Sequence, residues 1–354
     1  MNAPNLLEIE QSKRSNLTRN LLFLFVCVAM VGAYGVQQFG GVEGVVAQVD
    51  VKIPVADKKS EKTGGDVVIE IQEKKIVVPV QVTTSTFDSS SFSAQKFLVK
   101  DVETGKTLLS KDEYEPHAIA SITKLMSALV LQEQGLRTTG TTTAANGEVF
   151  DTFLQSHFVY DVHDVWNAAL IGSSNRAILS LVDELGIGRD VFVAKMNEKA
   201  NELGMSTARF MDPTGLDAGN VATASDVLML LGEALNNEEM YSTLAKTEYA
   251  FATVEGEHSR DIYNTNWLLL GWIPNTFSVV HPGKTGYIPE SLYNFTTRVE
   301  NEAGNALDVV VLGTASHEAR FEEARDLAEW IFDNYEWHTK IIQVPVNRAD
   351  AALN

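Results

Sequence analysis

The chain has 354 residues, of which 45% are hydrophobic and 21% are charged, so it can bury a sizeable core and is not a disordered protein. Its formal net charge of -19 gives no electrostatic support for a nucleic-acid partner, and none is expected. The single cysteine, Cys27, excludes an intrachain disulfide.

The first structural signal is an uncharged apolar run. Residues 21–36 read LLFLFVCVAMVGAYGV, follow three basic residues between positions 13 and 19, and precede no Lys or Arg until Lys52. This charge bias predicts that residues 1–20 stay in the cytoplasm and that everything after the run lies outside it. Two interpretations stay open: a transmembrane anchor, which makes a single-pass cell-membrane protein, and a cleaved signal segment, which makes a secreted one.

Residues 37–91 are expected to form an extracytoplasmic spacer. They turn from polar and charged (ADKKSEKTGGD) to β-prone (VVIEIQEKKIVVPVQVTT) and then to Ser/Thr-rich (TTSTFDSSSFS). One small hairpin around Glu73-Lys74-Lys75 and a linker without regular structure both fit this composition.

A folded domain is expected over residues 92–338, with residues 339–354 as a C-terminal tail. It opens with KFLVKDVETGKTLLSKD, which alternates apolar residues on either side of a turn at 103–105 and predicts two antiparallel strands. Residues 121–134 (SITKLMSALVLQEQ) repeat apolar side chains at helical spacing. They predict a buried helix with Ser121 at its N-terminal edge.

The middle of the domain is predicted to be helical. Between about residues 161 and 236 four segments carry helical patterns closed by Gly or Asn: VHDVWNAALIG, RAILSLVDELG, DVFVAKMNEKANELG and SDVLMLLGEALN. Three strand-like runs follow at 277–287, 293–299 and 306–314, and a last helix runs from His317 to about Tyr335. Strands at both ends around a helical middle predict an α+β fold, in which helices flank one antiparallel sheet and form a helical subdomain.

Three short strings within this domain occur in an informative order. They are Ser121-Ile122-Thr123-Lys124, Ser173-Ser174-Asn175 and Lys284-Thr285-Gly286, the last on a predicted strand. Together they form the signature set of a serine acyl-transfer site whose base is a lysine.

Each string alone is weak, because the chain contains second copies of two of them. Ser93-Ala94-Gln95-Lys96 also fits Ser-x-x-Lys, and Lys62-Thr63-Gly64 also reads Lys-Thr-Gly. Ser93 begins a predicted strand, where residues three apart point to opposite faces, whereas residues three apart on a helix share a face. The second Lys-Thr-Gly lies in the polar spacer. Context therefore favours the set that begins at Ser121.

The spacing of this set fits acyl transfer. A serine hydroxyl is a poor nucleophile until a base takes its proton, and Lys124 lies one helical turn from Ser121. The lysine must be neutral, so its pKa has to fall from ~10.4 towards about 7 through burial and positive charge, for which Lys284 is the expected source. Ser121 also gains from the helix dipole, and its backbone N–H can be an oxyanion donor. Ser173 and Asn175 lie between two predicted helices, where they either face a cleft or cap a helix.

The segment from Phe92 to Tyr335 resembles the low-molecular-mass penicillin-binding proteins, the serine D-alanyl-D-alanine carboxypeptidases of peptidase family S11. The resemblance rests on ASITKLMSALVLQE, GSSNRA, residues 195–226, NTNWLL at 264–269 and GKTGYIPES at 283–291. It implies the β-lactamase/transpeptidase-like fold and hydrolysis of the terminal D-Ala-D-Ala bond of peptidoglycan stem peptides, without a cofactor. It also implies that β-lactams inhibit the enzyme by trapping the acyl-enzyme.

Carried over by position, the resemblance implies that Ser121 is the acylated nucleophile, Lys124 its base and Ser173 a proton relay. Asn175 would hold the substrate amide. The strand residues Lys284 and Thr285 would receive the terminal carboxylate, Gly286 would let the strand lie close to the substrate, and the Tyr287 backbone N–H would complete the oxyanion hole.

Some positions depart from the family pattern. Ile119 replaces a proline that is usual two residues before the nucleophile, and Pro282-Gly283 replaces the common Gly-x before Lys-Thr-Gly. An additional arginine that some members use for the carboxylate is not evident in the strand that ends in LGTAS. Arg320 lies nearby and is assigned to the last helix.

Two other functions stay open. A β-lactamase shares two of the strings, but the chain has no Glu-x-x-Leu-Asn string, and Ser174 stands where such enzymes usually carry aspartate. A catalytically silent cell-wall-binding module would keep the fold, but the intact Ser121, Lys124, Ser173 and Lys284 argue against it. No metal site is expected, because the seven histidines are scattered without a His-x-x-x-His pair.

Overall fold

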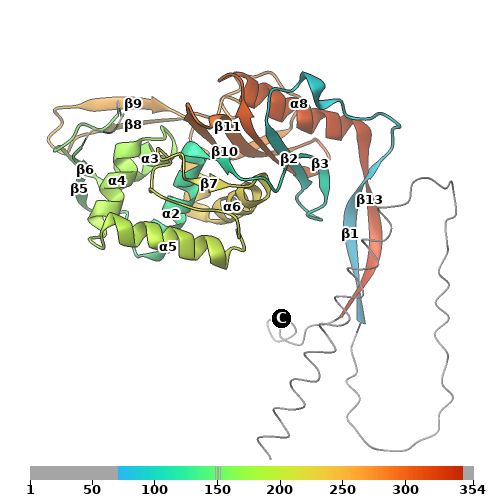
Figure 1. Ribbon diagram of the computed structural model, residues 1–354, viewed down its shortest axis with the longest axis horizontal. Coiled ribbons are helices and arrows are strands. Elements are labelled where there is room, and N and C mark those ends of the chain that lie inside the picture. Colours follow the sequence, from blue (N-terminus) through green and yellow to red (C-terminus); the bar gives the residue numbers. More distant parts are fainter. Residues whose placement is uncertain (1–70, 148, 150, 152, 346–354) are drawn as a thin grey trace, which may run out of the picture. The chain divides into compact units, whose positions relative to one another are not determined.

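The computed structural model describes residues 71–147, 149, 151 and 153–345 (Figure 1). All of them belong to one compact unit. The apolar run at 21–36, most of the predicted spacer and the second Lys-Thr-Gly lie outside the described residues. Among the helices that are described, none combines the length and the apolar composition that a membrane span requires.

A five-stranded antiparallel sheet forms the centre of this unit. Its spatial order is β10-β11-β12-β2-β3, so strands from the two ends of the chain lie together. Val99 of the first hairpin, for example, pairs with Val309. The sheet confirms the predicted hairpin and the three predicted C-terminal strands. Its members are β2 (Lys96–Asp101), β3 (Thr107–Lys111), β10 (Val279–Ile288), β11 (Leu292–Glu300) and β12 (Ala306–Thr314).

Helices cover both faces of the sheet and build a helical region beside it. The predicted helices are confirmed, whereas α7 was not predicted: Asn237 ends α6, and its side chain accepts the Met240 N–H at 3.0 Å, so that a second short helix starts at once. The helices are α2 (Thr123–Glu133), α3 (Val162–Leu170), α4 (Asn175–Glu184), α5 (Arg189–Glu202), α6 (Ala224–Asn236), α7 (Glu238–Leu244) and α8 (Ala319–Asn334), with 3-10 turns η1 (Ser89–Ser91) and η2 (Ala120–Ile122).

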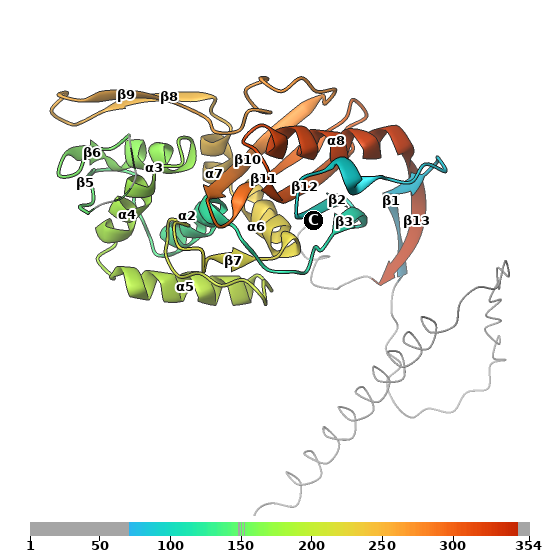
Figure 2. The ribbon, with the colours of Figure 1, turned by 45° about the horizontal axis from the view of Figure 1, so that its top comes forward.

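The alternation of side chains along the strands creates two cores. Leu98 and Val310 point into the larger core, which they share with the helical region. Their neighbours Phe97 and Val309 point into a second core under α8. Figure 2 shows α8 on one side of the sheet and α6 on the other. This layered arrangement confirms the α+β prediction.

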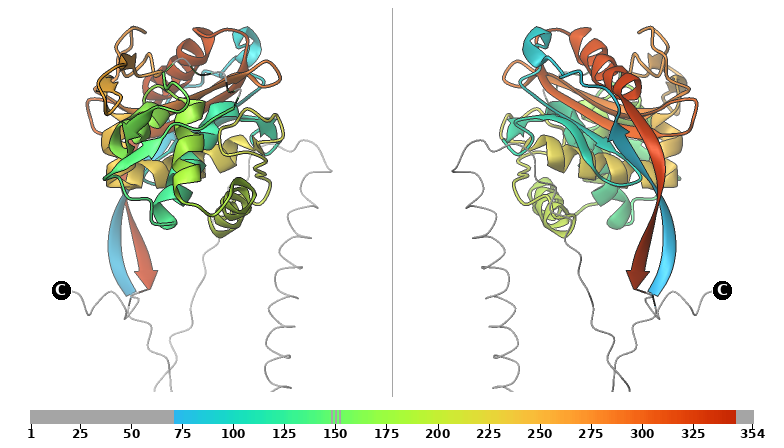
Figure 3. Two further views of the ribbon diagram at one scale, coloured as in Figure 1. Left: turned by 90° about the vertical axis from the view of Figure 1, so that its left-hand side faces the viewer. Right: turned by 90° about the vertical axis from the view of Figure 1, so that its right-hand side faces the viewer.

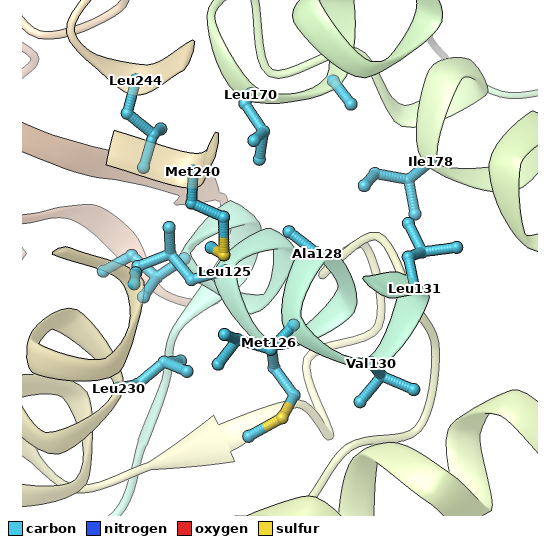
Figure 4. Close-up of a cluster of buried hydrophobic side chains, with 14 of the residues drawn as sticks. Leu125, Met126, Ala128, Val130, Leu131, Leu170, Ile178, Leu230, Met240 and Leu244 are labelled. Atoms are coloured by element: carbon cyan, nitrogen blue, oxygen red, sulfur yellow. The ribbon is translucent and has the colours of Figure 1, made fainter. Parts of the chain in front are cut away.

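Helix α2 lies inside the larger core (Figure 4). Residues Thr123 to Leu131 are all buried, as expected of a helix with neighbours on every side. This packing holds the start of α2, where Lys124 lies, and the turn η2 before it, which carries Ser121. The apolar side chains of other helices around it include Leu170, Ile178, Leu230, Met240 and Leu244.

Strand β1 (Ile71–Gln81) pairs antiparallel along its whole length with β13 (Tyr335–Pro345), as Figures 1 and 3 show. The hairpin considered around residues 73–75 is therefore wrong, and so is a linker without regular structure over residues 71–81, because these residues form one continuous strand. Residues 339–345 of the predicted tail belong to β13, which begins directly after the last helix ends at Asn334. Local pattern could not reveal this pair, because each strand's partner lies at the other end of the domain.

Three smaller antiparallel pairs complete the described fold. The pair β4 (His117–Ala118) and β7 (Val221–Ala222) positions the site, because it ties the segment before Ser121 to the loop that contains Thr214. The other pairs are β5 (Thr141–Thr143) with β6 (Val159–Asp161), and β8 (Glu248–Ala252) with β9 (Ser259–Tyr263).

Candidate active site

The fold brings the three sequence strings together. Ser121 lies in η2 and Lys124 in the first turn of α2, and Lys124 Nζ is 2.9 Å from Ser121 Oγ. Ser173 lies in the turn before α4, and Asn175 is the first residue of that helix. Lys284, from β10, donates to Ser173 Oγ at 2.8 Å. Lys124 Nζ also lies 2.7 Å from Asn175 Oδ1, so all three strings contact one another.

The surroundings of Lys124 favour a neutral amine. Its side chain is 0% exposed, and burial lowers its pKa to about 7, against the opposing effect of the Asp212 and Asp151 carboxylates. Its nitrogen lies 2.7 Å from both Asn175 Oδ1 and the Thr214 carbonyl oxygen.

These contacts define where the lone pair points. A neutral amine has two N–H donors and one lone pair, and the oxygens of Asn175 and Thr214 can only accept. Both N–H groups are therefore occupied, and the lone pair is left for the Ser121 hydroxyl hydrogen. The predicted nucleophile and base have the geometry that proton transfer between them requires. The Thr214 carbonyl was not predicted as part of the site.

Lys284 is buried as deeply as Lys124, with 1% of its side chain exposed. Burial, and then the positive charges of Lys124 and Arg320, hold its pKa well below the ordinary value. Its partner Ser173 has φ of 62°, a left-handed conformation that is uncommon outside glycine. Such strain is typical of functional sites and here turns Ser173 Oγ towards Lys284.

The helix-capping interpretation of this string is correct for its middle residue, Ser174. Its hydroxyl donates to Asp151 Oδ2 and accepts the Ala177 N–H at 3.0 Å, so Ser174 is the N-cap of α4. One serine of the string caps the helix, and its neighbours Ser173 and Asn175 reach the site.

Two glycines allow the backbones of the site to approach closely. A Cβ on Gly286 would lie 2.4 Å from the Ile119 carbonyl oxygen. A Cβ on Gly215, which has φ of +88°, would lie 2.0 Å from the Ala120 carbonyl oxygen. The glycine of Lys-Thr-Gly thus lets β10 pack against the turn that carries Ser121, a contact that differs from its predicted approach to substrate.

A pocket of about 320 Å³ opens beside the nucleophile. Thr285 contributes a hydroxyl that lies 2.7 Å from Thr265 Oγ1, and β10 is the edge strand of the sheet. The predicted site residues that line the pocket are Ser121, Ser173, Thr285, Gly286 and Tyr287.

Arg320 also lines this pocket and was not predicted to contribute. It belongs to α8, as expected, but only 4% of it is exposed and its guanidinium lies 5.5 Å from the Tyr293 ring centre and 4.8 Å from that of Phe321. Its Nε has no hydrogen-bond partner among the described residues, and one terminal nitrogen lies 3.4 Å from the Gly286 carbonyl oxygen. Burial lowers its pKa to about 10. In the sequence, the position of Arg320 shortly after the strand that ends in LGTAS was the sign that its side chain could reach the site.

Arg320 therefore brings a positive charge to the pocket of a chain whose net charge is -19. The hydrogen-bond partners described for Lys124, Lys284 and Arg320 are neutral oxygens. Aromatic rings stabilise the arginine without occupying its N–H groups. Such an arrangement favours an anionic group, because a carboxylate gives the buried guanidinium the charged partner that it lacks.

A serine beside a buried lysine, packed against the edge strand of an antiparallel sheet flanked by helices, defines a serine acyl-transfer enzyme of the β-lactamase/transpeptidase-like fold. The family model of D-alanyl-D-alanine carboxypeptidases, peptidase family S11, matches residues 81–316. The chain belongs to this family and is a serine-type DD-peptidase.

Named relatives carry two activities. A D-alanyl-D-alanine endopeptidase of Pseudomonas aeruginosa is 30% identical over 239 residues, which cover 66% of this chain and 76% of the relative. The D-alanyl-D-alanine carboxypeptidase DacF of Bacillus subtilis is 28% identical over 262 residues, or 69% of this chain and 64% of the relative. The match therefore defines the class of enzyme more firmly than the type of bond it prefers.

Solved structures confirm the fold. A D-alanyl-D-alanine carboxypeptidase from Mycobacterium tuberculosis is 26% identical and matches with a TM-score of 0.62 over 72% of this chain and 96% of that one. A mutant form of the DD-transpeptidase of Streptomyces K15 is 22% identical and shares the fold with a TM-score of 0.63 over 69% of this chain and 99% of that one.

Proposed function

We propose that the protein is a serine-type D-Ala-D-Ala carboxypeptidase that acts on peptidoglycan stem peptides through an acyl-enzyme on Ser121, and that it binds penicillins. One observation carries the assignment: Lys124 Nζ lies 2.9 Å from Ser121 Oγ, while oxygens of Asn175 and Thr214 occupy its two N–H groups. Membership of the S11 family supports the same chemistry.

Acylation begins when Ser121 Oγ attacks the carbonyl carbon of the scissile bond and the hydroxyl proton passes to Lys124 Nζ. The backbone N–H groups of Ser121 and Tyr287 donate to the oxygen that becomes negative. The C–N bond then breaks, and the leaving nitrogen takes up a proton supplied from Lys124 through Ser173. Because Lys284 donates to Ser173 Oγ, the Ser173 hydroxyl hydrogen is free to be given to the leaving nitrogen.

Deacylation reverses these roles. A water molecule attacks the ester carbon and gives a proton to the amine of Lys124. The bond between the carbon and Ser121 Oγ breaks, and the serine recovers its proton. The net reaction adds one water and releases the shortened peptide and D-alanine.

Groups of the pocket provide recognition of the substrate's terminal carboxylate. Thr285 presents a hydroxyl and Arg320 a positive charge, and Lys284 adds an amine that donates to Ser173 Oγ. The Nε of Arg320, which has no partner among the described residues, is a donor that a carboxylate can occupy. Asn175, beside Lys124, holds the amide of the substrate backbone. These roles favour a free C-terminal carboxylate, as in a carboxypeptidase substrate.

We also propose that the domain acts outside the cytoplasm. The apolar run at 21–36, with basic residues before it, supports export by either an anchor or a signal segment. An extracytoplasmic place also agrees with a peptidoglycan substrate.

The function is tested by release of D-alanine from a stem pentapeptide that ends in D-Ala-D-Ala. The full-length protein is expected to release one D-alanine per peptide, and Ser121→Ala to release none above background. The matched control, Ser93→Ala, alters the other Ser-x-x-Lys sequence and is expected to stay within about twofold of the unmodified protein. Release by Ser121→Ala, or no release by the unmodified protein, contradicts the proposal.

A further inference from the structure

We infer that Asp212 is a positioning residue for acylation: its carboxylate shapes the loop of residues 212–217 so that the Thr214 carbonyl oxygen faces the amine of Lys124. The inference deepens the proposed function and rests on it, because the step that Asp212 serves is the transfer of a proton from Ser121 to Lys124. Asp212 acts on this step through the Thr214 carbonyl and through its own negative charge.

The Thr214 carbonyl oxygen is one of the two acceptors that occupy the N–H groups of Lys124, at 2.7 Å from Nζ. The other acceptor, Asn175, belongs to helix α4. Thr214 instead lies in a run of bends over residues 211–215. The backbone hydrogen bonds of a helix or a sheet do not fix the shape of such a segment, so other groups have to hold the carbonyl in place.

The Asp212 carboxylate holds this segment. Its Oδ1 accepts the Thr214 N–H and the Thr214 hydroxyl, each at 2.5 Å, and the Gly215 N–H at 3.0 Å. Its Oδ2 accepts the Asp217 N–H at 2.8 Å. A carboxylate can accept several hydrogen bonds at once, and bonds to a charged acceptor are stronger than bonds between neutral groups.

One of these bonds sets the direction of the Thr214 carbonyl. The carbonyl of Thr214 and the N–H of Gly215 belong to the same peptide unit, which is planar and trans, so the two groups point in opposite directions. Because Asp212 holds the N–H, the oxygen points away from Asp212 and towards Lys124 Nζ. Loss of the carboxylate would let this peptide unit rotate.

The loop is also tied to α2, the helix that carries the base. Asn220 Nδ2 donates to the Asp212 carbonyl oxygen at 2.8 Å and to Thr123 Oγ1 at 3.1 Å. Ser127 Oγ donates to the Pro213 carbonyl oxygen at 2.6 Å. Asn220, Thr123 and Ser127 are all buried. These contacts keep the loop beside the helix, and the Asp212 carboxylate then determines where the Thr214 oxygen points.

The negative charge of Asp212 acts on the base as well. A nearby carboxylate favours the protonated amine, and Asp212, ahead of Asp151, opposes the effect of burial on the pKa of Lys124. Lys284, on β10, is the cation that interacts with Lys124. Asp212 therefore keeps Lys124 basic enough to take up the serine proton, since a base works best when its pKa lies near the operating pH.

Two substitutions separate the shape of the loop from the charge. Asp212→Asn keeps an oxygen that can accept the Thr214 and Gly215 N–H groups and removes the charge, whereas Asp212→Ala removes both. Acylation of the full-length proteins by labelled penicillin is measured by stopped flow between pH 5 and 9, and urea unfolding reports whether each is folded. The control Asp217→Asn removes an exposed charge from the same loop and should leave the rate within about twofold at each pH.

Asp212→Ala is expected to be acylated about 10²-fold more slowly at every pH, because the Thr214 carbonyl no longer directs the lone pair of Lys124. Asp212→Asn should be acylated within about tenfold of the unmodified protein at pH 9. Its profile should also move to lower pH by at least about half a unit, because loss of the negative charge lowers the pKa of Lys124. A residue with a merely structural role would not move the midpoint of this profile.

A folded Asp212→Ala that is acylated at the rate of the unmodified protein overturns the inference. So does an Asp212→Asn profile whose midpoint is unchanged. Both results leave the proposed function intact, because Ser121 is still acylated. An unmodified protein that penicillin does not acylate would instead overturn the proposed function, and this inference with it.

Discussion

The two Ser-x-x-Lys sequences of this chain have the same serine and lysine at the same spacing. They differ in the groups that these two side chains contact. In the first, Ser93 Oγ donates to Glu323 Oε1 at 2.5 Å, and Lys96, on β2, forms an ion pair with Glu115 at 3.3 Å. In the second, Lys124 contacts Ser121 at 2.9 Å from the next turn of a buried helix.

The comparison shows that the groups bound to the serine and the lysine determine whether the pair can carry out acyl transfer. Carboxylates engage both Ser93 and Lys96, whereas Lys124 is held by neutral oxygens in the interior of the protein. Burial without a directly bound acid lowers the pKa of Lys124 to about 7 and prepares it to act as a base.

Replacing each lysine in turn should produce the largest contrast. Lys124→Ala removes the base and is expected to lower the rate of acylation by labelled penicillin by about 10³-fold, within the range of general-base effects. Lys96→Ala should stay within about twofold, because its partner Glu115 lies on the surface. A comparable loss in both variants would mean that the two sequences do not differ as described.

Acylation of Ser121 also requires the turn that carries this serine to pack closely against β10. Gly286→Ala would place a Cβ 2.4 Å from the Ile119 carbonyl oxygen and force the strand and the serine-bearing turn apart. Acylation is expected to fall by about 10²-fold, as small displacements of reacting groups can cause. Gly232→Ala, in α6 with open space around the added carbon, is the matched control and should not change acylation. Normal acylation by Gly286→Ala would show that this close contact is dispensable.

The pH dependence of the acylation rate tests the difference between Lys124 and Lys96 in a second way. The neutral form is the base, and its pKa of about 7 lies below the ordinary value, so protonation removes the base as pH falls below about 7. The acylation rate should drop about tenfold per pH unit below that point and level off above it. Stopped-flow labelling between pH 5 and 9 measures this profile in the unmodified protein and in Lys96→Ala. A rate that is flat from pH 5 to pH 8 argues against a lysine base.

The smallest expected effect concerns stability. Glu323 accepts hydrogen bonds from the hydroxyl and the backbone N–H of Ser93, so Ser93→Ala should lower the free energy of unfolding by about 0.5–1 kcal/mol and leave acylation unchanged. Urea unfolding of Ser93→Ala and Ser121→Ala, followed by fluorescence, gives the comparison. If Ser93→Ala reduced acylation while remaining folded, its purely structural role would be refuted.

Local patterns predicted much of the fold. The apolar spacing of α2, the hairpin of β2 and β3 and the strands β10 to β12 are visible because each element carries its own periodicity. The pairing of β1 with β13 and the β8–β9 hairpin were not predicted. Their strands depend on partners or turns that a short window does not specify.

The site was predicted to a similar extent. Ser121, Lys124, Ser173 and Lys284 follow from the ordered strings, and the structure brings them into contact. The Thr214 carbonyl and Arg320 could not be found in this way. A backbone oxygen carries no residue signature, and a helical arginine reaches the pocket only through the packing of α8 on the sheet.

The most direct test is to locate the residue that penicillin acylates. The full-length protein is incubated with labelled penicillin, digested and mapped by mass spectrometry, and release of the label is followed over time. One label per chain on Ser121, released slowly, is the predicted result. A label on Ser93 or any other residue, or one that persists in Ser121→Ala, would contradict the assignment of the nucleophile.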